Sequence, residues 1–172
     1  TFNAAVGWSL FIVFFLSVIV VSVNIPGIAY SFREDGQYRT EQIIDLKGST
    51  AVLKVNETGS DDYGRVSLTL IGYEGNVLRL EQIFKAQGSS RPKAIENARD
   101  IKYHISTQDS VITFDSNIQF GNETVFRGQQ LKMLLYIPYG YPFIMDESFS
   151  NFIQHYVDED YAHGYTWSMK PS

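Results

Sequence analysis

The sequence predicts a mainly β protein of 172 residues, with an N-terminal transmembrane helix ahead of a β-rich domain. Three observations lead to this prediction. Residues 4–23 carry no charge, short apolar runs alternate with turn residues from residue 43 onward, and residues 131–137 repeat with a period of two. Strands this short and evenly spaced are typical of an irregular solenoid or a β-sandwich, and two short helices interrupt them.

The uncharged segment "AAVGWSLFIVFFLSVIVVSV" would form a helix of roughly 30 Å, which matches the hydrocarbon core of a bilayer. Ser9, Ser17 and Ser22 can donate to helix carbonyls, so they cost little there. A signal peptide is the alternative, but it needs a basic start, and "TFN" has none. The first residue is Thr, so we expect a longer parent chain. The side chains predicted to anchor the helix are Trp8, Phe11, Phe14, Phe15, Leu16 and Val20.

The expected organisation has three parts. Residues 1–24 form the transmembrane helix, residues 25–42 a polar juxtamembrane linker, and residues 43–172 the β-rich extramembrane domain. The first charges after the helix nearly cancel, so the positive-inside rule does not decide its orientation.

Composition excludes several classes of function. The net charge is −5 and the pI is about 5.1, and the chain has no basic run, which argues against nucleic acid as a partner. The chain has no cysteine, so a disulfide framework, a thiolate zinc site and a cysteine nucleophile are excluded.

Runs of β-branched and aliphatic residues predict the strands, and Gly, Asn, Asp and Ser clusters predict the turns between them. In 131–137, Leu131, Met133, Leu135 and Ile137 share one face, as in a strand buried on one side. The predicted strands are Ile43–Leu46, Ala51–Asn56, Arg65–Ile71, Val77–Ala86, Ile101–Thr107, Ser110–Phe114, Asn117–Phe120, Leu131–Ile137 and Pro142–Met145.

The two predicted helices have recognisable starts. In "SSRPKAIENARDI", serines precede Pro92, which suits the first turn, and Ala94, Ala98 and Ile101 share a stripe. In "DESFSNFIQHYV", Asp146 is the expected N-cap of an amphipathic helix. Such a helix would cover an end or a face of the β structure.

The histidines and acids provide no recognisable catalytic or metal-binding pattern. His104 is expected on the polar face of a strand. His155, His163 and the acids between them contain imidazole and carboxylate groups, which suit zinc or calcium, but their spacing matches no tight site for either metal. We therefore predict no catalytic, cofactor-binding or metal-binding residue and no cofactor, and we expect a protein that is not an enzyme.

Two stretches resemble the β-rich part of Bacteroidetes PspC-domain (phage-shock-protein C-like) membrane proteins. The first is "SSRPKAIENARDIKYHISTQDSVITFD", and the second is "FRGQQLKMLLYIPYG". The matching residues are Ser90, Arg91, Ala94, Ala98, Ile101, Tyr103, Asp109, Ser110, Phe126, Arg127, Gly128, Gln129, Pro138 and Gly140. The similarity extends from about residue 43 to the end, together with the preceding apolar helix.

The resemblance implies a PspC domain, several membrane helices and a β domain similar to the β-helical adhesin-head (GIN-type) domains. An irregular right-handed β-helix is therefore the favoured fold, with the β-sandwich as the alternative. The PspC part is absent from this sequence, so the resemblance carries over no stress-response role that depends on it. The resemblance brings no enzymatic activity either.

The aromatic residues near the C-terminus are the candidate interaction surface. Tyrosine and tryptophan favour interfaces because they bury large areas with little loss of entropy. Packing in the core is the competing explanation for the same residues. The candidates are Tyr136, Tyr139, Tyr141, Phe143, Tyr165 and Trp167.

Together these features predict a non-enzymatic accessory or scaffold subunit of a membrane complex, with a possible link to envelope stress. An adhesin-like or ligand-sensing head is one alternative, and an envelope-polymer hydrolase is a weaker second. The expected partners are other membrane subunits or further copies of this chain, and the lipid bilayer, with no nucleic acid. The expected location is the bacterial inner membrane, with the β domain in the periplasm.

Overall fold

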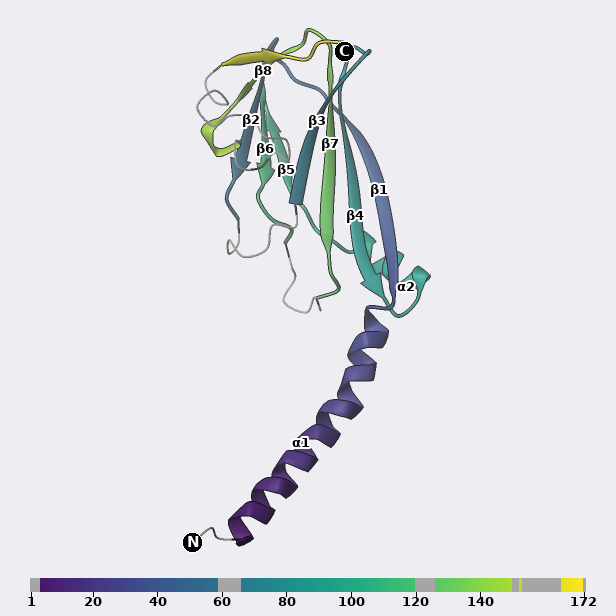
Figure 1. Ribbon diagram of the computed structural model, residues 1–172. Coiled ribbons are helices and arrows are strands. Elements are labelled where there is room, and N and C mark those ends of the chain that lie inside the picture. The colour runs from purple at the N-terminus through teal and green to yellow at the C-terminus, as the bar shows by residue number, and fades with distance from the viewer. Residues whose placement is uncertain (1–3, 59–65, 120–125, 150–151, 153–164, 172) are drawn as a thin grey trace.

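The computed structural model describes residues 4–58, 66–119, 126–149, 152 and 165–171, with the side chains of residues 4, 5 and 23–29 left out. Helix α1 comes first, and strands with two short helical segments follow (Figure 1). The elements are α1 (Ala4–Ser31), β1 (Glu34–Ile44), β2 (Ala51–Asn56), β3 (Val66–Tyr73), β4 (Leu78–Gly88), α2 (Arg91–Arg99), β5 (Ile105–Gln108), β6 (Val111–Asp115), β7 (Gln130–Pro138), β8 (Pro142–Met145), the 3₁₀ helix η1 (Glu147–Phe149) and β9 (Thr166–Ser168).

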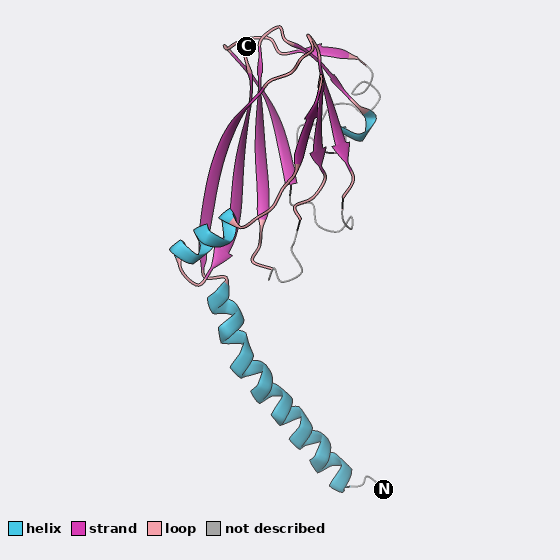
Figure 2. Cartoon of the chain, turned by 180° about the vertical axis from the view of Figure 1, so that it is seen from behind, coloured by secondary structure: helices cyan, strands magenta, loops and turns pink. Residues whose placement is uncertain are grey.

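The described strands form two sheets that face each other (Figures 1 and 2). One has four strands in the order β1-β4-β7-β3, and the other has five in the order β5-β6-β2-β8-β9. Strand β4 is antiparallel to both of its neighbours, whereas β3–β7, β2–β6 and β2–β8 are parallel pairs.

The predicted right-handed β-helix is wrong. A β-helix stacks parallel strands coil upon coil, but the antiparallel β1–β4–β7 ladder breaks that stacking. In the part of the chain that the structure describes, the strands close no solenoid; they form two separate sheets. The prediction of a mainly β chain with two packed sheets and short helices is closer to the observed fold.

The predicted transmembrane helix is also wrong. Residues Ala4–Ser31 do form one helix, and Ser9, Ser17 and Ser22 donate to carbonyls three or four residues earlier, as expected. A membrane span requires about 20 consecutive apolar residues. Among the residues described, no helix combines the length and apolar character that crossing a membrane needs.

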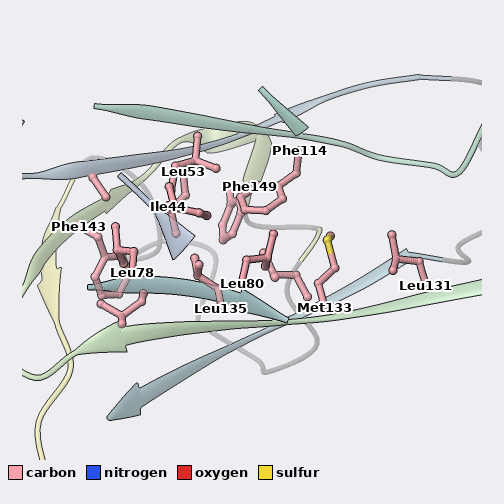
Figure 3. Close-up of a cluster of buried hydrophobic side chains, with 14 of the residues drawn as sticks. Ile44, Leu53, Leu78, Leu80, Phe114, Leu131, Met133, Leu135, Phe143 and Phe149 are labelled. Atoms are coloured by element: carbon pink, nitrogen blue, oxygen red, sulfur yellow. The ribbon is translucent and has the colours of Figure 1, made fainter. Parts of the chain in front are cut away.

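Apolar side chains from both sheets form one core (Figure 3). On β7 the period-two prediction is confirmed, because Leu131, Met133, Leu135 and Ile137 are all buried. From the opposite sheet come Leu53 of β2, Ile112 and Phe114 of β6, and Phe143 and Met145 of β8. Burial of such side chains contributes about 1.5–3 kcal/mol each relative to exposure.

Helix α2 packs against one end of the β1–β4 ladder, where β1 starts and β4 ends. Ser90 caps the helix by accepting from the Lys93 backbone N–H at 3.4 Å, and Ala94 and Ala98 are fully buried, as the sequence predicts. Gly36 and Gly88 make this contact possible. A Cβ on Gly36 would lie 2.4 Å from the Ala94 carbonyl carbon, and one on Gly88 would lie 2.5 Å from the Ala94 nitrogen.

Most strand predictions are confirmed, with differences at β1, β9 and residues 117–120, and β5 is shorter than predicted, at Ile105–Gln108. Strand β1 begins at Glu34, within the range expected to be a linker, and β9 was not predicted. Between Asn117 and Phe120 the described residues contain only an isolated bridge, from Gln119 to Lys102. Strand β1 is polar because it is an edge strand with an exposed face, so its hydrophobic pattern is weak.

The predicted cap at Asp146 is confirmed for η1. The Asp146 side chain accepts from the Ser148 backbone N–H at 3.2 Å and from the Ser148 hydroxyl at 2.8 Å. These bonds, the hydroxyl first, lower the pKa of Asp146, and Lys54 adds to the effect from 3.5 Å. Phe152 packs against the core, whereas Ile153, Tyr156 and Val157 of the predicted helix lie outside the described residues.

The substitution Gly36→Ala should destabilise the fold, because the new methyl group collides with the backbone of α2 rather than with a movable side chain. We expect a loss of about 1–3 kcal/mol in the free energy of unfolding, measured by denaturant titration. Gln42→Ala, at an exposed position on the same strand, is the control and should change it by less than about 0.5 kcal/mol. Equal effects would contradict the close packing of α2.

Candidate interaction surfaces

The structure separates the six candidate aromatic residues rather than gathering them into one patch. Phe143 is 3% exposed and belongs to the core, so packing rather than an interface explains it. Trp167 lies opposite Phe143 in the β8–β9 ladder and packs against the same core. Tyr141 also packs there, and its hydroxyl donates to the Gly48 carbonyl at 3.4 Å; burial raises its pKa.

Tyr139 and Tyr165 are the exposed members of the set, at 38% and 58%. Tyr139 follows β7, and its backbone N–H donates to the Tyr73 carbonyl at the end of β3. The Gly140 N–H donates to the Met169 carbonyl just after β9. The two sheets are therefore tied together at the end of the domain farthest from α1, which we call the distal end (Figure 1).

Tyr136 lies on the outer face of the four-stranded sheet, opposite the core. Its hydroxyl donates to Glu81 Oε2 at 3.1 Å, and Arg39 Nη1 lies 2.8 Å from Glu81 Oε1. The Arg79 guanidinium carbon lies 4.3 Å from the Tyr136 ring centre and 5.4 Å from that of Tyr73. This cluster joins all four strands of the sheet and pairs the buried Glu81 carboxylate with an arginine.

Sequence reasoning missed this cluster. Its signal was the alternation of Arg79 and Glu81 with leucines along β4, which places both charges on one face. Burial raises the pKa of Tyr136, and its hydrogen bond to Glu81 raises it further, while Arg79 and Arg39 oppose the shift. The arrangement keeps the phenol protonated and the sheet face rigid; it supplies no reactive group.

A second feature is a cleft of about 720 Å³ where β1, β4 and α2 come together, which we call the basal cleft. It lies at the opposite end of the domain from Tyr139. Its walls come from the starts of β1 and α2 and the end of β4, with Gly128 and Gln130 at the start of β7. Its charged lining residues are Arg33, Glu34, Asp35, Lys85 and Arg91.

His104 is exposed, as predicted, with Nδ1 4.0 Å from Asp115 Oδ2. Asp115 is buried and accepts from Asn56 Nδ2 at 3.0 Å and Gln119 Nε2 at 3.3 Å. Burial, with Asp115 nearby, raises the pKa of Tyr103, whose hydroxyl donates to the Asp115 carbonyl. These bonds hold the β6 end together. His155, His163 and the acids between them lie outside the described residues.

The predicted membrane anchors are all exposed along α1. The helix leaves the β domain at the basal end and extends away from it (Figures 1 and 2). The large apolar side chains described between Val6 and Val21 are exposed. The exposed anchors are Trp8, Phe11, Phe14, Phe15, Leu16 and Val20.

Comparison with known proteins identifies the β domain. A family model described as "ToastRack found in some PspC" matches residues 63–172, which is more than half of the chain. The chain belongs to this ToastRack family. The matched range includes both stretches whose resemblance to PspC proteins was predicted, but it does not extend to residue 43. No curated protein and no solved structure matches the chain.

Family membership confirms the PspC-associated β domain and is consistent with a membrane-associated protein linked to envelope stress. It carries no information on the predicted Bacteroidetes origin or the likeness to adhesin heads. Both stay predictions.

Glu81→Gln should lower the pKa of Tyr136, because it removes the carboxylate that stabilises the protonated phenol. Burial, the largest single cause of the raised pKa, remains in this variant. A raised folded pKa means that the stabilisation from Tyr136 is full below pH 10.0 and is lost as the pH rises through the folded value. NMR titration of the labelled tyrosine ring measures this.

Glu41→Gln is the matched control, because Glu41 pairs with Arg79 at 3.1 Å and makes no hydrogen bond to Tyr136. An equal fall in the pKa of Tyr136 in both variants would show that the specific contact with Glu81 is not the cause.

Proposed function

We propose that this chain is a non-enzymatic, membrane-associated protein of the bacterial cell envelope that acts by binding other proteins of a membrane complex. Membership of the ToastRack family found in some PspC proteins is the observation on which the proposal rests. The proposed location is the inner membrane, with the β domain on its periplasmic side. A role in the response to envelope stress fits the same family.

The exposed helix α1 supports membrane association. Its described side chains from Val6 to Ser22 are apolar on every side apart from the serines, and those serines donate to the helix backbone. A helix that is apolar all round is stable only when apolar material surrounds it. We propose that these exposed apolar side chains associate with lipid.

The distal end supports a binding function. Tyr139 and Tyr165 expose aromatic surface beside a rigid junction of the two sheets, and preorganised aromatic residues are typical interface anchors. Tyr136 stays a candidate interface residue, although the Arg79 guanidinium already packs over its ring. An adhesin-like head is the second candidate, since it would use the same exposed aromatic residues for a soluble ligand.

Replacing Phe11 and Phe15 by Ser should weaken association with lipid vesicles by about 100-fold or more, because each loses roughly 1.5 kcal/mol or more of apolar burial. Flotation of the full chain with phosphatidylcholine vesicles measures the change. Val77→Ser, at an exposed valine of the β domain, is the control and should leave flotation unchanged. Flotation that is equal in all three proteins would contradict lipid contact through α1.

The partner proposal predicts that Tyr139→Ala with Tyr165→Ala reduces the recovery of a stoichiometric membrane complex by at least about tenfold, as expected when interface anchors are lost. A tagged chain, extracted in mild detergent and analysed by quantitative mass spectrometry, measures recovery. Ile43→Ala, at a more exposed apolar residue on β1, is the control. Recovery of the wild-type chain alone or as a simple homo-oligomer would overturn the accessory-subunit proposal.

A further inference from the structure

We infer that the basal cleft binds the phosphate of an anionic lipid headgroup. The inference rests on the proposed membrane association and goes beyond it, since it assigns a site, a ligand chemistry and an orientation of the β domain.

The position of the cleft relates it to α1. Only Phe32 and Arg33 separate the end of α1 from the start of β1, and Arg33 lines the cleft. The cleft therefore opens where the apolar helix meets the polar domain. When the apolar side chains of α1 contact lipid, the short link keeps the cleft close to the membrane surface.

Aromatic and cationic side chains lie near the cleft, where α1 ends. Tyr30 is 56% exposed and Phe126 is 48% exposed, and the rings of Phe32 and Phe126 lie 6.1 Å apart. The Arg127 guanidinium carbon lies 5.7 Å from the Phe32 ring centre. Aromatic rings and arginines are the side chains that favour the boundary between lipid and water.

In the cleft, two of the three cations have fewer polar partners than the carboxylates. Arg33, Lys85 and Arg91 supply positive charge, and Glu34 and Asp35 supply negative charge. Asp35 accepts a hydrogen bond from Gln87 Nε2 at 3.1 Å, and Glu34 lies 4.0 Å from Arg33. The Lys85 and Arg91 side chains make no hydrogen bond or ion pair among the described residues. Within the described part of the chain, these two cations are thus available to an incoming anion.

The position of Arg91 in α2 adds to this argument. It is the first residue of α2, where the helix dipole is positive and acidic side chains are favoured. The first turn of α2 contains no acid, and Lys93 pairs with Glu96 at 2.9 Å on the exposed side. Arg91 therefore has no acidic partner in the first turn, and a bound phosphate would supply the missing negative charge.

The net charge of the chain bears on how the domain would meet an anionic membrane. The net charge is −5, which repels an anionic surface, so binding of a headgroup in the cleft would orient the domain with the basal end toward the membrane. The cleft volume of about 720 Å³ has room for a phosphate with its glycerol.

Lysine acetylation on the full chain in vesicles tests the inference. Lys85 should react about fivefold more slowly when phosphatidylglycerol is mixed into phosphatidylcholine vesicles, and high sodium chloride should restore its rate. Lys47 and Lys170 are internal controls, because both are exposed and lie toward the distal end, so their rates should not change. Mass spectrometry reads all three sites in one sample.

Arg91→Gln should remove most of the protection of Lys85. Lys132→Gln, at an exposed lysine on β7 that does not line the cleft, changes the charge equally and should leave the protection intact. Equal Lys85 rates in neutral and anionic vesicles, while the chain floats with both, would overturn the lipid site and leave the proposed membrane association standing. Failure to float with either vesicle would overturn the proposed association itself.

A further experiment distinguishes a lipid phosphate from a soluble phosphate. Inorganic phosphate is added to the chain in phosphatidylcholine vesicles, and the Lys85 rate should stay unchanged. Protection by inorganic phosphate equal to that by phosphatidylglycerol would assign the cleft to a soluble phosphate compound and overturn the lipid headgroup.

Discussion

The rest of the structure depends on the burial of one face of β7 against the opposite sheet. Leu131, Met133, Leu135 and Ile137 are at most 1% exposed, and β7 is an inner strand of its sheet. Because side chains alternate across a strand, this burial fixes which residues of β3 and β4 face inward. It also places Glu81 and Tyr136 together on the outer face, where each satisfies the other.

The same alternation explains how much could be predicted from the sequence. Strands with strong hydrophobic patterns, such as Ala51–Asn56 and Pro142–Met145, were predicted with their observed bounds. Strand β1 was missed over most of its length because its edge position leaves it polar, and β9 is a three-residue strand. The pairing of strands was beyond the sequence, since a period of two specifies a face and not a neighbour. The solenoid prediction was wrong because it depended on strand pairing, which the pattern does not specify.

The candidate sites follow the same logic. Composition identified the aromatic residues, but their roles depend on contacts between distant parts of the chain. Phe143 faces the core because β8 pairs with β2, while Tyr139 is exposed because it lies in the turn after β7. The basal cleft combines residues 33–37, 85–91 and 128–130, which no local motif connects. Only Arg91 gave a local signal, as a cation at a helix start.

The short link between α1 and β1 gives the proposed surfaces a common geometry. With two residues between helix and strand, the basal end of the domain cannot move far from α1. Strand β1 has 11 residues, so its far end lies about 35 Å from its start. In the proposed placement, the cleft meets the headgroups while Tyr139 and Tyr165 are held some tens of ångströms above them. A phosphate in the cleft would fix the tilt of the domain, because α1 alone leaves rotation about the two-residue link free. The lipid contact would therefore decide in which direction the distal aromatic residues are presented to a partner.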